Sequence, residues 1–345
     1  TPFRVSMAQK GIIPIALKPF IDRRMYYKHN PSHVNTNKAS GLKWLLVSCY
    51  GYLRFREFKA GIPSSHMCIC ALARETLLQV IKLAEDRGFD VVHAIADCLY
   101  ITKKDMTERE VELFRKEMEQ LTNIPVFFEG IFKWITFLPS VRDKKRALPA
   151  TYYGVFQNGD IKARGIEVRQ KSVPKVVKYF QTEAMLKLRE CNSKKEIVKK
   201  APELFRDLRY LLSTLNSIDT KLLVTKIKIS KEHYANNIPQ KVIVEKLKKR
   251  GEEILPGHTI KFIFGQNGPV LLEEYDGKLD VKQYTKLLIR SLFNILQPFG
   301  FTKEMIEERI GRYRQTTLLE FTPDQIIGQF FYNKSIHKEK KNYAI

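Results

Sequence analysis

The sequence contains no apolar run approaching the roughly 20 residues that a membrane-spanning helix needs, so no transmembrane segment is expected. Its start also lacks the charged stretch followed by an apolar stretch that is typical of a signal peptide. These absences predict a cytoplasmic protein that engages no membrane. The chain begins with Thr1 rather than Met, which indicates processing or a piece of a longer polypeptide.

Cysteine is too scarce and too irregularly spaced to predict a disulfide framework or a zinc module. The five cysteines form an odd number, and none of them stand in C-x-x-C spacing. His66, Cys68 and Cys70 lie close together in the sequence, but their spacing fits no common metal site. We therefore predict reduced cysteines that contribute to packing.

Acidic residues are the minority among the charged side chains. The chain has 60 Lys and Arg against 37 Asp and Glu, which gives a formal net charge of +23. A chain this basic is expected to bind polyanions, with an affinity that depends strongly on salt. A ribosome-associated protein, or a member of a generally basic proteome, would carry a similar charge, so both alternatives stay open here.

Hydrophobic periodicity divides the chain into an α+β part and a mainly helical part. Helices are predicted over 15–28, 38–48, 74–87, 108–121, 176–215, 239–250 and 281–299. Strands are predicted as a pair within 90–102 and singly within 126–138 and 223–229, with a turn at Asn158-Gly159. The region up to about 169 is thus predicted to contain a mostly antiparallel sheet. The stretch after about 312 is polar and is predicted to be a tail.

One segment carries a spacing known from polymerases. LKWLLVSCYGYLRF, at 42–55, resembles the fingers motif K-x-x-x-N-S-x-Y-G of family B DNA polymerases. Lys43, Ser48, Tyr50 and Gly51 match this motif, whereas Val47 stands where the family has Asn.

A second segment, VVHAIADCLYIT at 91–102, is similar to the palm motif Y-x-D-T-D-S of the same family. Asp97 matches its second Asp, while Ile95 replaces the first Asp and Ala96 the Thr. Three further collinear segments extend the resemblance to about 11–313. The chain is thereby identified as a member of the archaeal-type family B polymerases with a disrupted palm motif.

The resemblance implies the fold of a right-hand polymerase portion. It predicts two-helix fingers at 1–60, an antiparallel-sheet palm at 61–170 and a mainly helical thumb at 171–312. A clamp-binding peptide and a basic tail would follow at 313–345. In this reading the protein acts in DNA replication or repair as a nucleoid-associated protein.

Nucleotide binding is predicted on the two fingers helices. Lys43 and Tyr50 fall on one helix face, and Arg24 and Lys28 share a face of the preceding helix. The resemblance assigns Arg24 and Lys43 to the triphosphate of an incoming dNTP and Tyr50, followed by Gly51, to the nascent base pair. On spacing alone, the alternative is that these residues form two basic helix faces that are solvated and bind no nucleotide.

Metal binding is predicted in the palm. Asp97 lies in an apolar stretch where a buried carboxylate needs a cation, and the resemblance makes it a catalytic ligand of Mg²⁺. Glu129 matches another acidic palm position near the metals. A solvent-exposed residue at a strand edge is the alternative for Glu129.

The palm-to-thumb passage is predicted to hold primer–template DNA by its phosphates. The residues concerned are Tyr153, Lys162, Arg164, Gly165 and Arg169. Thr151 stands where the family has a basic residue, which weakens the expected grip on the primer.

The chain alone is predicted to be catalytically incomplete. It lacks the upstream D-x-x-S-L-Y-P-S motif that carries the family's other essential Asp, and Ile95 and Val47 replace further motif residues. Either an N-terminal polymerase subunit completes it, or it is a non-catalytic architectural subunit that binds primer–template DNA and the sliding clamp. A general RNA-binding protein is a third alternative.

A short peptide near the end of the sequence resembles the sliding-clamp motif Q-x-x-h-x-x-a-a. Gln315 would be the polar hook, and Leu318 and Phe321 the apolar anchors of a single helical turn. Thr322 stands where a second aromatic residue is common. An amphipathic turn packed on the thumb is the alternative.

Overall fold

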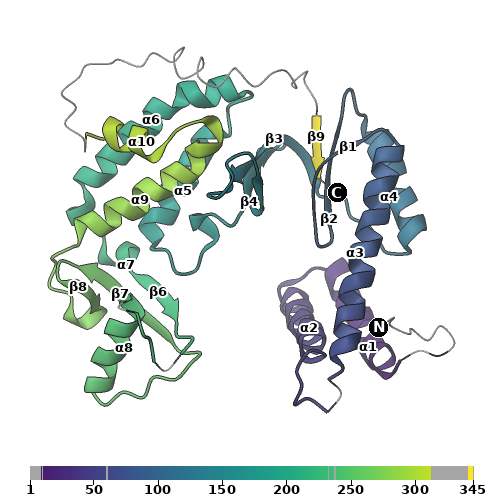
Figure 1. Cartoon of the computed structure of the whole chain (residues 1–345), viewed down its shortest axis with the longest axis horizontal. Coiled ribbons are helices and arrows are strands. Elements are labelled where there is room, and N and C mark those ends of the chain that lie inside the picture. The colour runs from purple at the N-terminus through teal and green to yellow at the C-terminus, as the bar shows by residue number, and fades with distance from the viewer. Residues whose placement is uncertain are drawn as a thin grey trace. The chain divides into compact units, whose positions relative to one another are not determined.

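The computed structural model describes residues 9, 11–59, 61–231, 233–236, 238–311 and 341–344. Figure 1 shows their helices and strands. They form two compact units, which we call the first and the second unit. The first unit contains residues up to 88 together with 96–98 and 116–125, and the second contains 89–95, 99–115 and the residues from 126 onward.

The first unit is built on a helical hairpin. Helices α1 (Ile12–His29) and α2 (His33–Tyr52) pack against each other. Ser32 caps α2 by accepting a hydrogen bond of 3.1 Å from the backbone N–H of Asn35. Helix α3 (Pro63–Asp86) begins with a proline, whose missing N–H is not needed in the first turn. The sequence placed the start of α3 eleven residues too late, at 74.

The second unit contains an antiparallel sheet, which confirms the predicted fold class. Its described strands are β1 (Asp90–Ile95), β2 (Cys98–Lys103), β3 (Gly130–Pro139), β4 (Ala147–Phe156), β5 (Ile161–Arg164) and β9 (Lys341–Ala344). Their order is β1-β2-β9-β3-β4-β5. The short strand β9 pairs antiparallel with β2 on one side and with β3 on the other. Helix α4 (Glu108–Thr122) agrees with the predicted 108–121.

Helices of the second unit pack around a continuous apolar core. Helix α5 (Lys175–Leu188) contacts α6 (Lys194–Ser213) and α9 (Val281–Leu296), and α10 (Lys303–Arg309) packs on α9. The helical pattern predicted over 176–215 forms two helices, because Ser193 caps a new helix by accepting a hydrogen bond from the backbone N–H of Glu196. Within the described residues, none of the helices has the length and apolarity to cross a bilayer.

A smaller sheet belongs to the same unit. Strands β6 (Thr225–Lys228), β7 (Thr259–Gly265) and β8 (Gly268–Leu271) pair antiparallel, and helix α8 (Pro239–Lys249) packs against β8. The short helix α7 (Thr220–Leu223) precedes β6, and the 3-10 turns η1 (Glu167–Arg169), η2 (Leu215–Ser217), η3 (Leu272–Glu274) and η4 (Gln297–Phe299) complete the unit. The hairpin of β7 and β8 was not predicted.

His93 on β1 is a partly buried group whose protonation we expect to make the stability of the second unit depend on pH. Its ring lies 4.9 Å from the ring of Phe137 and 5.5 Å from that of Tyr100, and its Nε2 is buried without a hydrogen-bond partner among the described residues. Burial lowers the pKa of His93 below its usual value, and the charge of Arg164 acts in the same direction. The unfolded chain therefore takes up the proton more readily than the folded protein.

The neutral form of His93 therefore favours the folded state. We expect its contribution to the free energy of unfolding to be complete above the ordinary histidine pKa of about 6.5 and to be lost as the pH falls below it. Urea unfolding between pH 7.5 and 5 measures it. His93→Phe should flatten the dependence of stability on pH, whereas replacement of the exposed His258 by Gln should leave it as in the parent protein. An unchanged slope in His93→Phe would contradict the assignment.

Candidate nucleic-acid interface

The helical hairpin of the first unit carries the residues predicted to bind a nucleotide. Lys28 is exposed on α1, and Lys43 and Gly51 are exposed on α2. Arg24 is half-buried, and its Nε is buried without a hydrogen-bond partner within the described part of the chain. A buried donor without an acceptor is costly, so Arg24 is a side chain that an anionic oxygen would stabilise.

Tyr50 makes contacts that its motif did not indicate. Its hydroxyl lies 2.8 Å from the Sγ of Cys70 on α3, and its ring stacks on His66 with the centroids 4.4 Å apart. The hydrogen bond with Cys70 raises the pKa of Tyr50. The tyrosine therefore joins α2 to α3 within the first unit.

Asp97 lies in the turn between β1 and β2, as predicted for a hairpin. The preceding Ala96 has φ 54°, in the left-handed region, and the carboxylate of Asp97 is exposed. The Sγ of Cys98 is 3.7 Å from Oδ1 of Asp97. The expectation that Asp97 is buried in apolar surroundings was wrong, because the turn carries it out of the strands and into solvent.

Lys162 on β5 pairs with the carboxylate of Glu129, which directly precedes β3. The ammonium of Lys162 also lies 5.4 Å from the ring centre of Tyr100. Two residues that were predicted for different ligands, phosphate and metal, thus meet in one ion pair.

Gly165 directly follows β5 and has a backbone conformation that favours glycine. Its φ is +72°, and a Cβ at this position would lie 2.6 Å from the carbonyl oxygen of Ala150 and 2.7 Å from Oγ1 of Thr151. Its carbonyl accepts a hydrogen bond of 3.1 Å from Nε2 of Gln170. The backbone between the exposed Arg164 and Arg169 is therefore held close to β4.

Tyr153 on β4 is a buried side chain that stabilises this region. Its side chain is fully buried, and its hydroxyl donates a hydrogen bond of 2.6 Å to the carbonyl oxygen of Ile295 on α9. Burial holds the pKa of Tyr153 well above its usual value. Its hydroxyl is thus used to join the sheet to α9.

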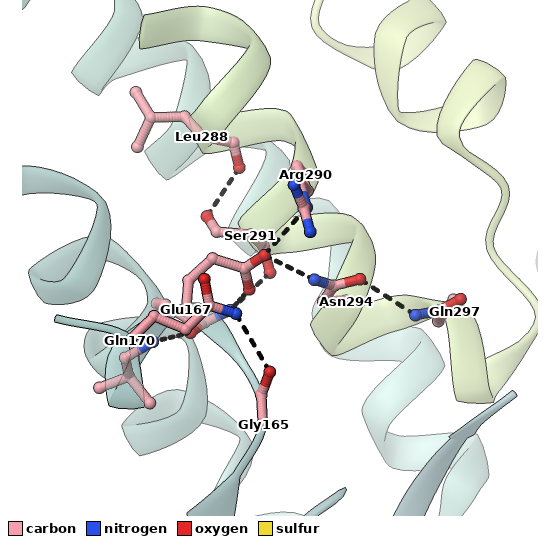
Figure 2. Close-up of polar contacts among 10 residues, drawn as sticks. Gly165, Glu167, Gln170, Leu288, Arg290, Ser291, Asn294 and Gln297 are labelled. Atoms are coloured by element: carbon pink, nitrogen blue, oxygen red, sulfur yellow. Dashed lines mark hydrogen bonds and ion pairs between the residues drawn. The ribbon is translucent and has the colours of Figure 1, made fainter. Parts of the chain in front are cut away.

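A buried carboxylate lies at the centre of the polar network in Figure 2. The side chain of Glu167 is 3% exposed. Its oxygens accept hydrogen bonds of 2.6 Å from Nδ2 of Asn294 and 2.8 Å from Nε2 of Gln181. Nε of Arg290 lies 3.3 Å from the same carboxylate, while the side chain of Arg290 remains 66% exposed. The network fixes the segment after Gly165 to α5 and α9.

The chain is similar in sequence to archaeal DNA polymerases. No protein-family model matches the chain. DNA polymerase 2 of Saccharolobus solfataricus is 31% identical over 191 residues, which cover 55% of this chain and 28% of the relative. DNA polymerase 1 of the same organism is 23% identical over 322 residues, which cover 88% of this chain and 35% of the relative.

A solved structure shows a similar fold. The family B DNA polymerase from the hyperthermophilic archaeon Pyrobaculum calidifontis superimposes with a TM-score of 0.51 at 21% identity, over 86% of this chain and 39% of that chain. The chain is homologous to archaeal family B DNA polymerases. It spans roughly a third of the length of the curated relatives quoted above.

The described residues of this polymerase homologue do not by themselves fit a site for two magnesium ions. No group of three or more His, Cys, Asp or Glu side chains that could hold a metal occurs among them. Asp97 is one exposed carboxylate, and Glu129 already pairs with Lys162. Two divalent ions need several carboxylate oxygens at fixed positions.

Sequence reasoning missed the network around Glu167 in the polymerase homologue. The basic passage KARGIEVR was singled out for its cations, whereas its one acidic residue proved to be buried. An acidic residue within a basic passage that is predicted to bind DNA is the signal that could have indicated this network. Gln315, Leu318 and Phe321 of the predicted clamp peptide lie outside the described residues.

Proposed function

We propose that this chain is the fingers, palm and thumb portion of a DNA-directed DNA polymerase that acts in replication or repair and is catalytically incomplete alone. The observation that carries the proposal is the homology to a DNA polymerase over 88% of the chain, combined with a palm turn in which Asp97 is the retained carboxylate and Ile95 replaces the other. We propose primer–template DNA and dNTP as its ligands, with Mg²⁺ in the complete assembly.

The fingers hairpin supports the nucleotide part of the proposal. The buried, unpartnered Nε of Arg24 needs an acceptor, and the exposed Lys28 and Lys43 add positive charge. A triphosphate supplies several anionic oxygens, which match these donors. Tyr50 and Gly51 would lie beside the nascent base pair.

An N-terminal polymerase subunit is the proposed partner that supplies the missing carboxylate. We expect Mg²⁺-dependent primer extension only when the chain is combined with a companion polypeptide that carries D-x-x-S-L-Y-P-S. Asp97→Asn should abolish this extension, since an amide cannot replace a charged metal ligand. Asp105→Asn changes another exposed turn carboxylate and should leave extension intact.

Extension at ordinary polymerase rates by the chain alone would contradict catalytic incompleteness. Tight binding of a primer–template junction without extension, with or without a companion, would favour the architectural subunit, which the replacements at Ile95 and Val47 also favour. Equal affinity for the junction and for unrelated RNA would favour the general RNA-binding alternative.

We also propose that the peptide at 315–321 binds a sliding clamp, in keeping with a nucleoid-associated protein. Buried aliphatic and aromatic anchors dominate such interfaces. Replacing Leu318 and Phe321 together by Ala should therefore abolish clamp binding in a surface plasmon resonance measurement. Leu319→Ala, at a position that the motif leaves free, is the matched control, and unchanged binding by the double variant would reject the proposal.

A further inference from the structure

The short strand β9 fills a space between two longer strands of the main sheet. It pairs antiparallel with β2 along Tyr100 to Lys103 and with β3 along Gly130 to Phe132. Figure 1 draws it as a short yellow arrow beside β2. We call the space between β2 and β3 the acceptor slot. A strand in this slot is paired along both of its edges, whereas a strand added to β1, the outermost described strand on that side, would be paired along one.

Side chains that do not come from β9 hold β2 and β3 one strand apart. The ring of Tyr100 on β2 stacks on that of Phe132 on β3, with the centroids 6.1 Å apart. The hydroxyl of Tyr100 lies 2.7 Å from that of Tyr152 on β4. All three side chains are almost fully buried. His93 on β1 also lies 4.9 Å from Phe137 on β3. The frame of the acceptor slot therefore does not depend on the residues that fill it.

The register of the sheet indicates which residues the acceptor slot takes. Ala344 lies directly opposite Tyr100 on one side and directly opposite Gly130 on the other. Residues opposite one another in a sheet point to the same face, so this row runs beside the ring of Tyr100. Small residues at two places in the row leave room for that ring to reach Phe132. The slot therefore favours an extended segment with a small residue opposite Tyr100.

Strand β9 has the sequence of a replaceable occupant. Lys341, Asn342 and Ala344 belong to residue types that are depleted in strands. The strand is four residues long, and it begins 32 positions after Arg309, the last residue of α10. Its few hydrogen bonds must offset the entropy lost when so distant a segment is ordered. A longer segment with a higher strand propensity would bind in its place.

The catalytic requirement of a polymerase indicates where such a segment comes from. Carboxylates that hold metal ions in common must lie close together, and the proposed function assigns the second carboxylate to a companion polypeptide. Asp97 directly precedes β2, and neighbouring strands lie about 4.8 Å apart. Strand β1 occupies one side of β2, so the acceptor slot is the other side. The occupant seen there, β9, contains no carboxylate in its sequence.

We propose that the acceptor slot binds a strand of the companion polypeptide, and that β9 competes with this strand for the same place. The inference rests on the proposed function, since that function requires the companion. It gives β9 a role of its own, because the companion strand pairs with β2 and β3 only after β9 has left.

Binding of a fluorescent peptide to the full chain tests the acceptor slot without any catalysis. The probe is three valines followed by D-A-A-S-L-Y-P-S, in which valine favours the extended strand. Tyr343→Pro removes a backbone donor from β9, so it should bind the probe at least about tenfold more tightly than the parent. Glu339→Pro is the matched control, because it places the proline before β9, and it should bind as the parent does. A probe with proline in place of two valines should bind none of the three proteins.

A disulfide that holds β9 in place tests the competition. Thr102 on β2 and Asn342 on β9 are directly opposite, and residues so placed have Cα atoms about 4.5–5.5 Å apart, within the range of a disulfide. Thr102→Cys with Asn342→Cys, oxidised with diamide, should lose both probe binding and companion-dependent primer extension, and dithiothreitol should restore both. Lys226→Cys with Lys261→Cys makes the same link between β6 and β7, and its oxidised and reduced forms should behave alike.

The outcomes separate this inference from the proposed function. Equal probe binding by the parent, Tyr343→Pro and Glu339→Pro, or binding by none of them, would overturn the acceptor slot. Failure of the cysteine pair on β2 and β9 to form a disulfide would do the same. An oxidised chain that still supports extension would show that the companion does not use the slot. Absence of extension from the reduced chain with its companion would count against the proposed function, while probe binding would still decide on the slot.

Discussion

Gly165→Ala is expected to lower the free energy of unfolding of the second unit by about 2–5 kcal/mol. The left-handed backbone accounts for about 1–2 kcal/mol of this, and the crowding of a new methyl group for about 1–3 kcal/mol. The crowding is severe because the neighbours are backbone atoms and a short side chain, with the carbonyl oxygen of Ala150 at 2.6 Å. The atoms of Ala150 and Thr151 cannot move away from the new methyl group without disturbing the pairing of β4 with β5.

Gly159→Ala is the matched control for this result. Gly159 also has a positive φ, of +88°, but its added Cβ would meet only the flexible side chain of Arg189, at 3.7 Å. Gly159→Ala should lower the free energy of unfolding by about 1–2 kcal/mol, from the backbone conformation alone. Denaturant unfolding of both variants measures the difference, and equal losses would show that the close approach at Gly165 is not rigid.

Glu167→Ala is the second substitution for which we expect a large effect, a loss of about 2–4 kcal/mol. It removes a charged acceptor of two hydrogen bonds and leaves Nδ2 of Asn294 without its partner. Nε2 of Gln181 keeps a bond of 3.0 Å to the carbonyl oxygen of Ser291, which limits the loss. The measurement is again denaturant unfolding of the second unit.

Glu129→Ala makes the same chemical change at an exposed ion pair in the same unit. The carboxylate of Glu129 is 46% exposed, so its pairing with Lys162 is screened by water and should contribute at most about 1 kcal/mol. A loss in Glu167→Ala no greater than in Glu129→Ala would mean that the buried network adds little to stability.

Much of the fold was predictable where the pattern was local. The amphipathic helix at Glu108–Thr122 and the hairpin at 90–103 were predicted nearly to their ends. Two failures also had readable signals. Gln266-Asn267 is the two-residue turn between the strands β7 and β8, and Gly268 follows it directly. Ser193 with Glu196 forms a capping box that divides the long helical stretch.

The start of α3 and the strand β9 could not be read in this way. Residues 63–73 have no clear apolar face, because α3 buries only Val80 and Ala84 near its far end. Strand β9 was predicted as part of a tail, since nothing in its four residues specifies a strand. Its conformation comes from pairing with β2 and β3, which are distant in the sequence.

The candidate site likewise has residues that the sequence motifs indicated and contacts that they did not indicate. The resemblance singled out Lys43 and Asp97 as candidate site residues, and their roles stay predictions. The motifs gave no indication of the contacts between distant residues, such as Tyr50 with Cys70, Lys162 with Glu129, or Glu167 with Asn294, which lie 20, 33 and 127 positions apart. Such pairs depend on how the elements pack, which local periodicity does not specify.

The position of β9 has a consequence for how the protein is made. The ribosome synthesises the β1–β2 hairpin and the β3–β5 meander early, but the strand that lies between them emerges about 200 residues later. Until then, β2 and β3 each present an unpaired edge, which is a template for association with other chains. Closing so long a loop is slow, so the completed sheet is expected to form late, after the local helices.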